Sequence, residues 1–381
     1  MTTPWSDARG AGRLVIDLTL LVTEVVETMH VTVLAAPAPL GNAPAGRTRG
    51  VTALVYRSVR GVTRIVGGAL DAVLAPLARL PAQGEAGVRR DAVVAALNGV
   101  LGDRLEASRN PLAIAMHVRH GGVALATTRE ALAAALPGAR PRLLVSVHGL
   151  CMNDGHWQRD GRDHGSAWAK ALDAETLALR YNSGRSIAAN GADLAAHLAD
   201  LVAHWPVPLH GIVLAGHSMG GLVIRSAIAQ AKPRAAWTKR LAAVVTLGAP
   251  FRGAPLERAG HGVDLLLGAS PYTAAFTRLA RVRSAGITDL RHGLRAPLPP
   301  PVPGLAVAGS LASARPRAGR TPRGDGLVPV TSALDGRVDA HAGAPATTRW
   351  IVSGTGHVAL LHSAKVRRRV REWLVATCGS G

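Results

Sequence analysis

The chain has 381 residues, enough to bury a full hydrophobic core as one large domain or as two ordinary ones. Hydrophobic residues make up 48% and charged residues 18% of the sequence, which excludes a disordered or fibrous protein. The formal net charge of +20 favours anionic partners such as membrane surfaces or acidic substrates. No zinc-finger spacing or aromatic-interleaved basic motif accompanies this charge, so no nucleic-acid partner is expected.

Targeting signals are not evident in the sequence. The N-terminus lacks a Lys/Arg-led region, and Asp17 interrupts the apolar stretch from Leu14 to Val22, which argues against a cleaved signal peptide. No uncharged apolar run reaches the roughly 20 residues that a spanning helix needs. Cys151 and Cys378 lie far apart and outside any C-x-x-C motif, so a reducing, cytoplasmic compartment is favoured.

Residues 1–137 are expected to form a helical region, because apolar residues recur there at helical spacing. Gly- and Pro-containing stretches separate three such segments, 14–30, 51–77 and 91–106. The second segment carries a narrow stripe of arginines, Arg57, Arg60 and Arg64. Such a basic amphipathic helix could lie on an anionic membrane, although most amphipathic helices pack on their own protein.

From Arg142 onward, apolar strands alternate with helical segments, which predicts a mostly parallel sheet covered by helices on both faces. Strands are expected at 142–148, 177–181, 211–217, 242–248, 304–309 and 348–353. Helices are expected at 186–205, 219–231 and 363–376. Residues 256–295 interrupt the alternation and are expected to form an insertion that could serve as a lid. The sequence therefore divides into the helical region 1–137 and an α/β domain at 138–381.

The most informative motif is Gly216-His217-Ser218-Met219-Gly220, which follows an apolar strand and precedes a helical segment. A nucleophilic serine must project from a strained turn, and glycines two residues away on each side permit the tight backbone approach. The helix that follows directs its N-terminal dipole at the serine, which favours negative charge there. A glycine-rich turn without chemistry is the alternative, but the strand-turn-helix context favours Ser218 as a nucleophile.

A serine nucleophile needs a base, and the base needs a carboxylate that orients it. Asp325 follows the expected strand at 304–309 in the motif Gly-Asp-Gly-Leu-Val-Pro, and His357 follows the strand at 348–353. The order Ser, Asp, His along the chain is the order that a strand-turn-helix nucleophile predicts. Four residues remain alternatives to Asp325 and His357, although each follows an expected strand less directly: Asp335, Asp339, His341 and His362.

Two backbone N–H groups are expected to stabilise the oxyanion of a tetrahedral intermediate. Leu150 lies in His148-Gly149-Leu150, in the loop after the strand at 142–148, and Met219 directly follows Ser218. His148 could be mistaken for the base, but in a His-Gly loop it more often has a structural hydrogen-bonding role.

Taken together, His-Gly-Leu, Gly-His-Ser-Met-Gly-Gly, Gly-Asp-Gly-Leu-Val-Pro and Gly-His resemble the motifs of bacterial lipases and esterases of the α/β-hydrolase superfamily. The resemblance extends to GPI inositol-deacylase-like members and covers roughly 142–376. It implies the α/β-hydrolase fold, the triad Ser218, Asp325 and His357, and N–H donors at Leu150 and Met219. Calcium-binding lipases often carry an acidic residue soon after the catalytic histidine, and none follows here, so no metal and no cofactor is expected.

These motifs predict hydrolysis of carboxylic esters, of small molecules or of lipids, through an acyl-enzyme. Amide or thioester hydrolysis and acyl transfer use the same triad and remain alternatives. From a different class, a membrane-associated scaffold with a secondary hydrolase fold would use the segments 14–30 and 51–77 as its working surface. The protein is expected in the cytoplasm with peripheral contact to anionic membranes, and the sequence indicates no oligomeric state.

Overall fold

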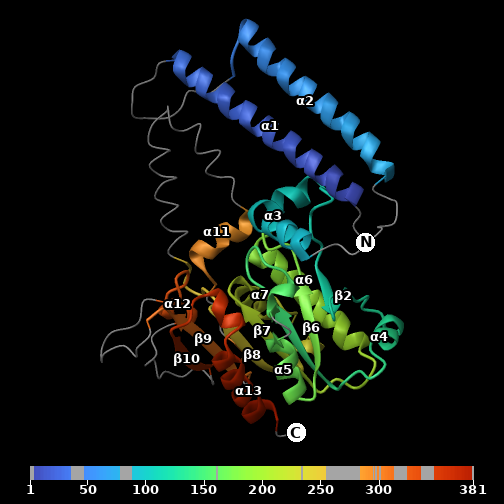
Figure 1. Ribbon diagram of the computed structural model, residues 1–381, viewed down its shortest axis with the longest axis vertical. Helices are drawn as coiled ribbons and strands as arrows, with labels where there is room; N and C mark the ends of the chain where they lie inside the picture. Colours follow the sequence, from blue (N-terminus) through green and yellow to red (C-terminus); the bar gives the residue numbers. More distant parts are fainter. Residues whose placement is uncertain are drawn as a thin grey trace. The chain divides into compact units, whose positions relative to one another are not determined.

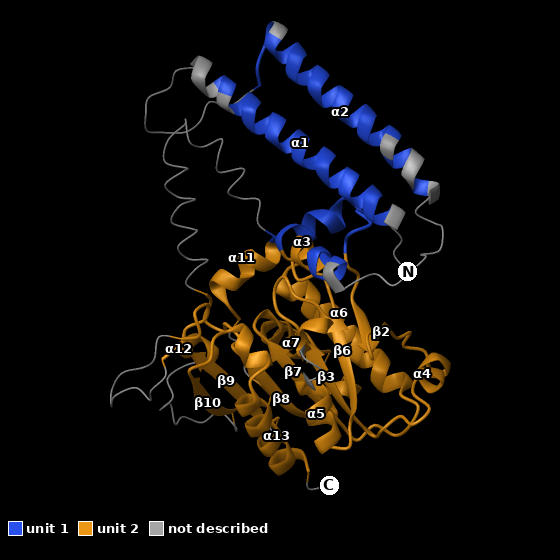
Figure 2. Cartoon of the chain, in the orientation of Figure 1, with its two compact units in different colours: residues 1–94, 100–113, 258–284 blue, residues 95–99, 114–257, 285–381 orange. Residues whose placement is uncertain are grey.

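The computed structural model describes residues 4–35, 47–77, 88–159, 162–232, 235–254, 284–294, 296, 298–299, 302–312, 324–335 and 347–379. The chain forms two compact units, coloured separately in Figure 2. Unit 1 consists of residues 1–94, 100–113 and 258–284, and unit 2 of residues 95–99, 114–257 and 285–381. The insertion expected at 256–295 lies mostly outside the described residues, which include only its last part with helix α11 (Ala285–His292).

Unit 2 is built on an eight-stranded sheet with the order β10-β9-β8-β7-β3-β6-β1-β2. Its strands are β1 (His117–His120), β2 (Val123–Ala124), β3 (Arg142–Val147), β6 (Glu175–Arg180), β7 (Gly211–His217), β8 (Leu241–Leu247), β9 (Gly304–Ser310) and β10 (Thr347–Ser353). The strands from β10 to β6 pair in parallel, and β1 and β2 extend one edge in antiparallel fashion. The six parallel strands are the six predicted from the sequence. A separate two-stranded ribbon pairs β4 (Gln158–Arg159) with β5 (Arg162–Asp163).

Helices cover both faces of this sheet (Figure 1). Helices α6 (Ile187–His204) and α7 (Met219–Ala229) pack on one face, and α5 (His164–Ala171) and α13 (Ala364–Cys378) pack on the other. Because successive side chains of a strand point to opposite faces, β7 contributes to two separate cores. Ile212 and Leu214 belong to the core under α6 and α7, whereas Val213 and Ala215 belong to the core under α13.

Shorter helices connect these elements: α4 (Arg129–Ala135), η1 (Asp154–Trp157), α8 (Ala236–Lys239), α12 (Val330–Ala333) and η2 (Val358–Leu361). Helix α6 shows how local sequence fixes an element. Its N-cap residue Ser186 accepts a hydrogen bond from the Ala189 backbone N–H at 3.1 Å, and Leu194, Leu198 and Leu201 bury one face. The predicted helices at 186–205, 219–231 and 363–376 are confirmed within a few residues.

The parallel sheet with helices on both faces is the predicted α/β-hydrolase fold. Strands β6 and β7 lie on opposite sides of β3, so the winding of the chain reverses there. Ligands of open α/β sheets bind at such a reversal, beyond the carboxyl ends of the strands. Ser218 directly follows β7, and the loop with Leu150 follows β3. The fold therefore brings two of the expected site segments to the same end of the sheet.

Unit 1 contains the helices α1 (Pro4–Ala35), α2 (Gly50–Leu77) and most of α3 (Val88–Ala107). Helices α1 and α2 lie side by side (Figure 1), and α1–α2–α3 are the helices expected from the periodicity. No helix among the described residues is long and apolar enough to cross a membrane. Within the expected helical region 1–137, residues 117–120 and 123–124 instead form the strands β1 and β2. The sequence His-Val-Arg-His has no apolar run, and its strand depends on pairing with β6.

Candidate active site

Ser218 lies in a strained turn between β7 and α7. Its backbone angles are φ 52° and ψ −124°, a combination that residues with a side chain rarely adopt. Neighbouring backbone holds the turn, because the Ser218 N–H donates to the Leu247 carbonyl at 2.8 Å and its own carbonyl accepts from the Gly221 N–H at 3.0 Å. Backbone strain of this kind accumulates at functional sites.

The two glycines of the motif are required by close backbone contacts. A Cβ atom on Gly216 would lie 2.6 Å from the Gly221 nitrogen, and one on Gly220 would lie 2.3 Å from the Val147 carbonyl oxygen. Neither neighbour is a flexible side chain that could move aside. The sequence-based explanation of these glycines, that they permit a tight approach, therefore agrees with their surroundings.

His357 and Asp325 form a buried pair. The His357 Nδ1–H donates to Asp325 Oδ2 at 2.8 Å, and the His357 backbone N–H donates to the Asp325 carbonyl at 3.0 Å. The other carboxylate oxygen accepts from the backbone N–H groups of Leu327 and Val328 at 3.0 and 2.8 Å. Four hydrogen bonds thus fix both the carboxylate and the imidazole that it contacts.

His217, between Gly216 and Ser218, packs under this pair. Its ring centre lies 4.8 Å from that of His357, and its Nε2 lies 3.1 Å from the His357 carbonyl oxygen. Since a carbonyl only accepts, Nε2 of His217 carries the proton. Complete burial, together with the charge of His357, lowers the pKa of His217 to about 3, so this side chain stays neutral near pH 7.

Ser218 and His357 both border the end of β8. Leu247 ends this strand and accepts the Ser218 N–H, while a Cβ atom on the next residue, Gly248, would lie 3.1 Å from His357 Nδ1. No hydrogen bond joins the Ser218 hydroxyl and the His357 ring within the described part of the chain. In unliganded enzymes this bond is often long and shortens when substrate binds.

The expected oxyanion donors lie at the ends of the neighbouring strands β3 and β7. Among the residues that the structure describes, neither the Leu150 nor the Met219 backbone N–H donates a hydrogen bond. A Cβ atom on Gly149 would lie 3.0 Å from the Ser218 Cβ, so the loop with Leu150 passes close to the serine. Both N–H groups are therefore available to an incoming oxygen atom.

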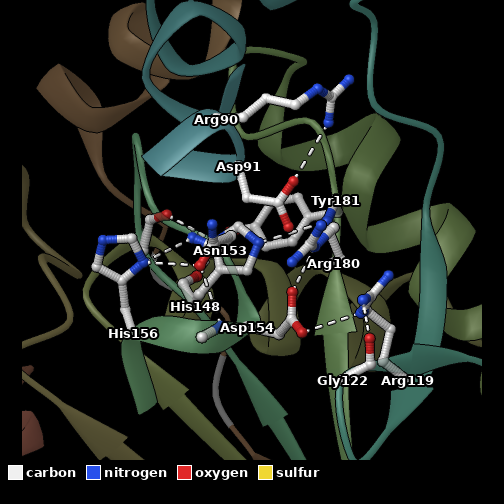
Figure 3. Close-up of polar contacts among 12 residues, drawn as sticks. Arg90, Asp91, Arg119, Gly122, His148, Asn153, Asp154, His156, Arg180 and Tyr181 are labelled. Carbon is white, nitrogen blue, oxygen red and sulfur yellow. Dashed lines mark hydrogen bonds and ion pairs between the residues drawn. The ribbon is translucent and has the colours of Figure 1, made fainter. Parts of the chain in front are cut away.

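The loop after β3 is held by a network that the sequence did not reveal (Figure 3). The His148 ring stacks on Tyr181 at 4.2 Å, and the Tyr181 hydroxyl donates to the His148 carbonyl at 2.8 Å. Farther along the loop, the buried Asp154 carboxylate pairs with Arg180 and with Arg119, whose Nε lies 2.9 Å away. Burial lowers the pKa of His148 to about 4, and its contacts support the expected structural role.

The alternatives to Asp325 and His357 have other surroundings. Asp335 lies two residues after the end of α12, with its carboxylate 4.0 Å from the Arg252 Nε. His362 ends the short helix η2. Asp339 and His341 lie outside the described residues. Of the residues predicted from the sequence, the structure joins Asp325 to His357, and it brings Gly149, the neighbour of Leu150, close to Ser218. It joins the serine to neither member of that pair by a hydrogen bond among the described residues.

The described residues include no group of three or more His, Cys, Asp or Glu side chains that could hold a metal ion. The arrangement that they do form is an imidazole with a fixed carboxylate beside a strained serine turn. Chemically, such an arrangement can transfer a proton between a hydroxyl group and a leaving group.

Residues 192–297 match the family model described as PGAP1-like alpha/beta domain. The chain has the fold of the α/β hydrolases. This match spans Ser218 and Met219 and includes neither Leu150, Asp325 nor His357. No curated protein matches the sequence.

Solved structures resemble the chain distantly. The mature form of Bacillus licheniformis lipase BlEst2 is 17% identical, with a TM-score of 0.43 over 62% of this chain and 93% of that one. Pyrococcus furiosus esterase Pf2001 is 16% identical, with a TM-score of 0.40 over 64% and 84%. A membrane phospholipase A described as a bacterial virulence factor is 15% identical, with a TM-score of 0.37 over 62% and 79%.

Replacing Ser218 by glycine is expected to stabilise the protein. Glycine adopts positive φ without strain, whereas Ser218→Ala keeps the side chain and the strain. Glycine also gains more entropy in the unfolded state, which offsets part of this effect. The free energy of unfolding of Ser218→Gly should therefore exceed that of Ser218→Ala by about 1 kcal/mol. Urea unfolding of the two variants measures the difference, and equal midpoints would show that the turn stores no strain.

Buried neutral histidines are expected to make stability depend on pH. His148 and His217 have lowered pKa values of about 4 and about 3, whereas the unfolded chain binds these protons near pH 6.5. Below about pH 6.5 the unfolded state therefore gains protons that the folded state lacks, and each histidine removes about 1.4 kcal/mol of unfolding free energy per pH unit. Urea unfolding between pH 7 and pH 5 measures this slope.

Histidine variants show which side chain causes the dependence of the unfolding free energy on pH. His148→Gln should make the slope shallower, and His210→Gln, at an exposed histidine, serves as the matched control. If His148→Gln has the same slope as the wild type, His148 is not the buried neutral side chain that this prediction requires.

Proposed function

We propose that the chain is a serine hydrolase that cleaves carboxylic esters, with Ser218 as nucleophile, His357 as base and Asp325 as orienting carboxylate. One observation carries this proposal: the buried hydrogen bond of 2.8 Å between His357 Nδ1 and Asp325 Oδ2. It lies at the carboxyl ends of the parallel strands, where Ser218 adopts its strained turn. A base with a fixed tautomer near a serine hydroxyl is what nucleophilic catalysis by serine requires.

Each residue has a defined step in the proposed reaction. The Ser218 Oγ attacks the ester carbonyl carbon while His357 Nε2 takes its proton, and the imidazolium stays hydrogen-bonded to Asp325 without passing that proton on. The Leu150 and Met219 N–H groups donate to the oxyanion. His357 then protonates the leaving alcohol oxygen, the C–O bond breaks, and water releases the acyl group from Ser218 by the same steps.

The carboxylate is prepared for this role before substrate binds. Oδ1 of Asp325 already accepts the Leu327 and Val328 N–H groups, which leaves Oδ2 aimed at His357. Two backbone donors stabilise a negative carboxylate and fix its orientation, so little reorganisation is needed when the imidazolium forms.

Lipid-like esters are the proposed substrate class. Support comes from the apolar side chains that α1 and α2 expose, from Val15 to Val26 and from Leu54 to Val66, and from the net charge of +20. Apolar surface suits acyl chains, and positive charge suits anionic headgroups. Thioester or amide hydrolysis and acyl transfer would use the same residues. A second candidate, a membrane-associated protein whose hydrolase fold is secondary, is favoured by the same exposed apolar surface.

Variants of the proposed triad are expected to lose activity without losing the fold. Ser218→Ala should abolish hydrolysis of p-nitrophenyl esters, and Asp325→Asn should lower kcat by about 10³–10⁴-fold because the imidazole loses its fixed tautomer. Asp335→Asn, at the described alternative carboxylate, should keep most activity. Turnover by Ser218→Ala equal to that of the wild type would sink the assignment. A kcat/KM that does not rise with acyl-chain length would sink the lipid-like substrate class.

A further inference from the structure

The loop after β6 holds the loop after β3 at two points. The Tyr181 hydroxyl donates to the His148 carbonyl at 2.8 Å, and the Cys151 backbone N–H donates to the Ser183 Oγ at 3.0 Å. Tyr181 and Ser183 are each 1% exposed, so both hydroxyl groups are shielded from solvent. The two bonds lie on either side of Leu150 along the chain. The segment that carries this expected oxyanion donor is therefore held from both ends.

Residues 149–152 form a β-turn that contains a strained residue. The Met152 N–H donates to the Gly149 carbonyl at 3.3 Å, and Cys151, the third residue of the turn, has φ 58°. Leu150, the second residue, has no positive φ, and this combination defines a type II turn. The third position of such a turn favours glycine, because a residue with a side chain is strained there. Strain of this kind persists only where neighbouring contacts maintain it.

Ser183 provides such a contact. A type I turn of the same residues would relieve the strain by turning over the peptide between Leu150 and Cys151. The Cys151 N–H would then point away from the Ser183 Oγ, and its hydrogen bond would be lost. Packing restricts the turn as well, because a Cβ atom on Gly99 would lie 2.8 Å from the Cys151 nitrogen. The bond to Ser183 thus favours the strained turn over the relaxed one.

Ser183 is itself fixed before any substrate binds. Asn190 of α6, which is fully buried, donates from Nδ2 to the Asn182 carbonyl at 2.9 Å and to the Arg185 carbonyl at 3.4 Å. A Cβ atom on Gly286 of α11 would lie 2.2 Å from the Ser183 carbonyl oxygen, so α11 packs directly on this loop. The Ser183 hydroxyl is therefore a rigid anchor, held by two helices.

We propose that Ser183 is a positioning residue for the oxyanion site: it holds the turn after β3 in the strained form in which Leu150 offers its N–H to the reacting carbonyl oxygen. This role of Ser183 rests on the proposed ester hydrolysis. Oxyanion donors act through a direction that is set before the reaction. If the turn relaxes, ψ of Leu150 changes together with φ of Cys151, so the donor residue no longer keeps a single conformation. Ser183 acts through the turn and takes no part in bond making.

Kinetics of Ser183→Ala in the full chain test the proposal. With a p-nitrophenyl ester, kcat should fall by about 10–100-fold and KM should change by less than about threefold, because the oxyanion forms only after the substrate is bound. Adding Cys151→Gly should restore most of kcat. Glycine adopts positive φ without strain, so the turn keeps its type II form without the bond to Ser183. Activity lost through general destabilisation would not return with this second substitution.

Ser186→Ala is the matched control in the same loop. The Ser186 hydroxyl also accepts a backbone N–H, from Ala189 at 3.1 Å, but it caps α6 and not the turn. This variant should unfold at a lower urea concentration and keep kcat within about threefold of the wild-type value. Hydrogen exchange of the Cys151 amide gives a readout without catalysis, and it should be at least about tenfold faster in Ser183→Ala than in the wild type.

Three results would overturn the proposal: a wild-type kcat in Ser183→Ala, a loss of kcat that Cys151→Gly does not restore, or unchanged exchange of the Cys151 amide. A wild-type protein without esterase activity would instead overturn the proposed hydrolysis, and with it the part that Ser183 plays in catalysis. The two failures are distinguishable, because amide exchange reports whether Ser183 holds the turn in an active or an inactive protein.

Discussion

The close backbone approach at Ser218 is the constraint on which the rest of the site depends. The turn can form only because Gly216 and Gly220 leave room for backbone atoms at 2.6 and 2.3 Å from where a Cβ would lie. In this turn Ser218 has a positive φ, and α7 begins at the next residue. Strain at this one residue is maintained by the buried strands on both sides, since isolated backbone would relax.

Burial of histidines gives the site its electrostatic character. His217 and His148 are both completely enclosed, and their lowered pKa values keep both side chains neutral near pH 7. Each instead holds backbone: His217 binds the His357 carbonyl, and His148 contacts Tyr181. The three histidines therefore divide into one that is paired with a carboxylate and two that position the loops around it.

Much of unit 2 was predictable because its information is local. Parallel strands buried on both faces require apolar runs, and β3, β7 and β9 have them. Asp325 and His357 could be selected because each lies in a Gly-containing turn that comes after a strand, β9 for Asp325 and the less buried β10 for His357. The edge strand β1 could not, since His-Val-Arg-His becomes a strand only by pairing with β6. Asp154 carried no signal, because its importance arises from Arg119 and Arg180, which are distant in sequence.

The helices of unit 1 show the other limit of sequence reasoning. Periodicity predicts that α1 and α2 are amphipathic, but it does not say which face meets a neighbour. The buried pair Glu27–Arg60 and the exposed Ile65 reverse the usual arrangement, and only three-dimensional contacts reveal it. The contacts of α1 and α2 therefore follow from the structure and not from the periodicity of their sequences.

Labelling with a fluorophosphonate probe, followed by peptide mapping, tests the central claim most directly, because the probe modifies only an activated serine hydroxyl. A single modified peptide that contains Ser218 is expected, as is loss of labelling in Asp325→Asn. A wild-type protein that stays unlabelled, or a label on another serine, would contradict it.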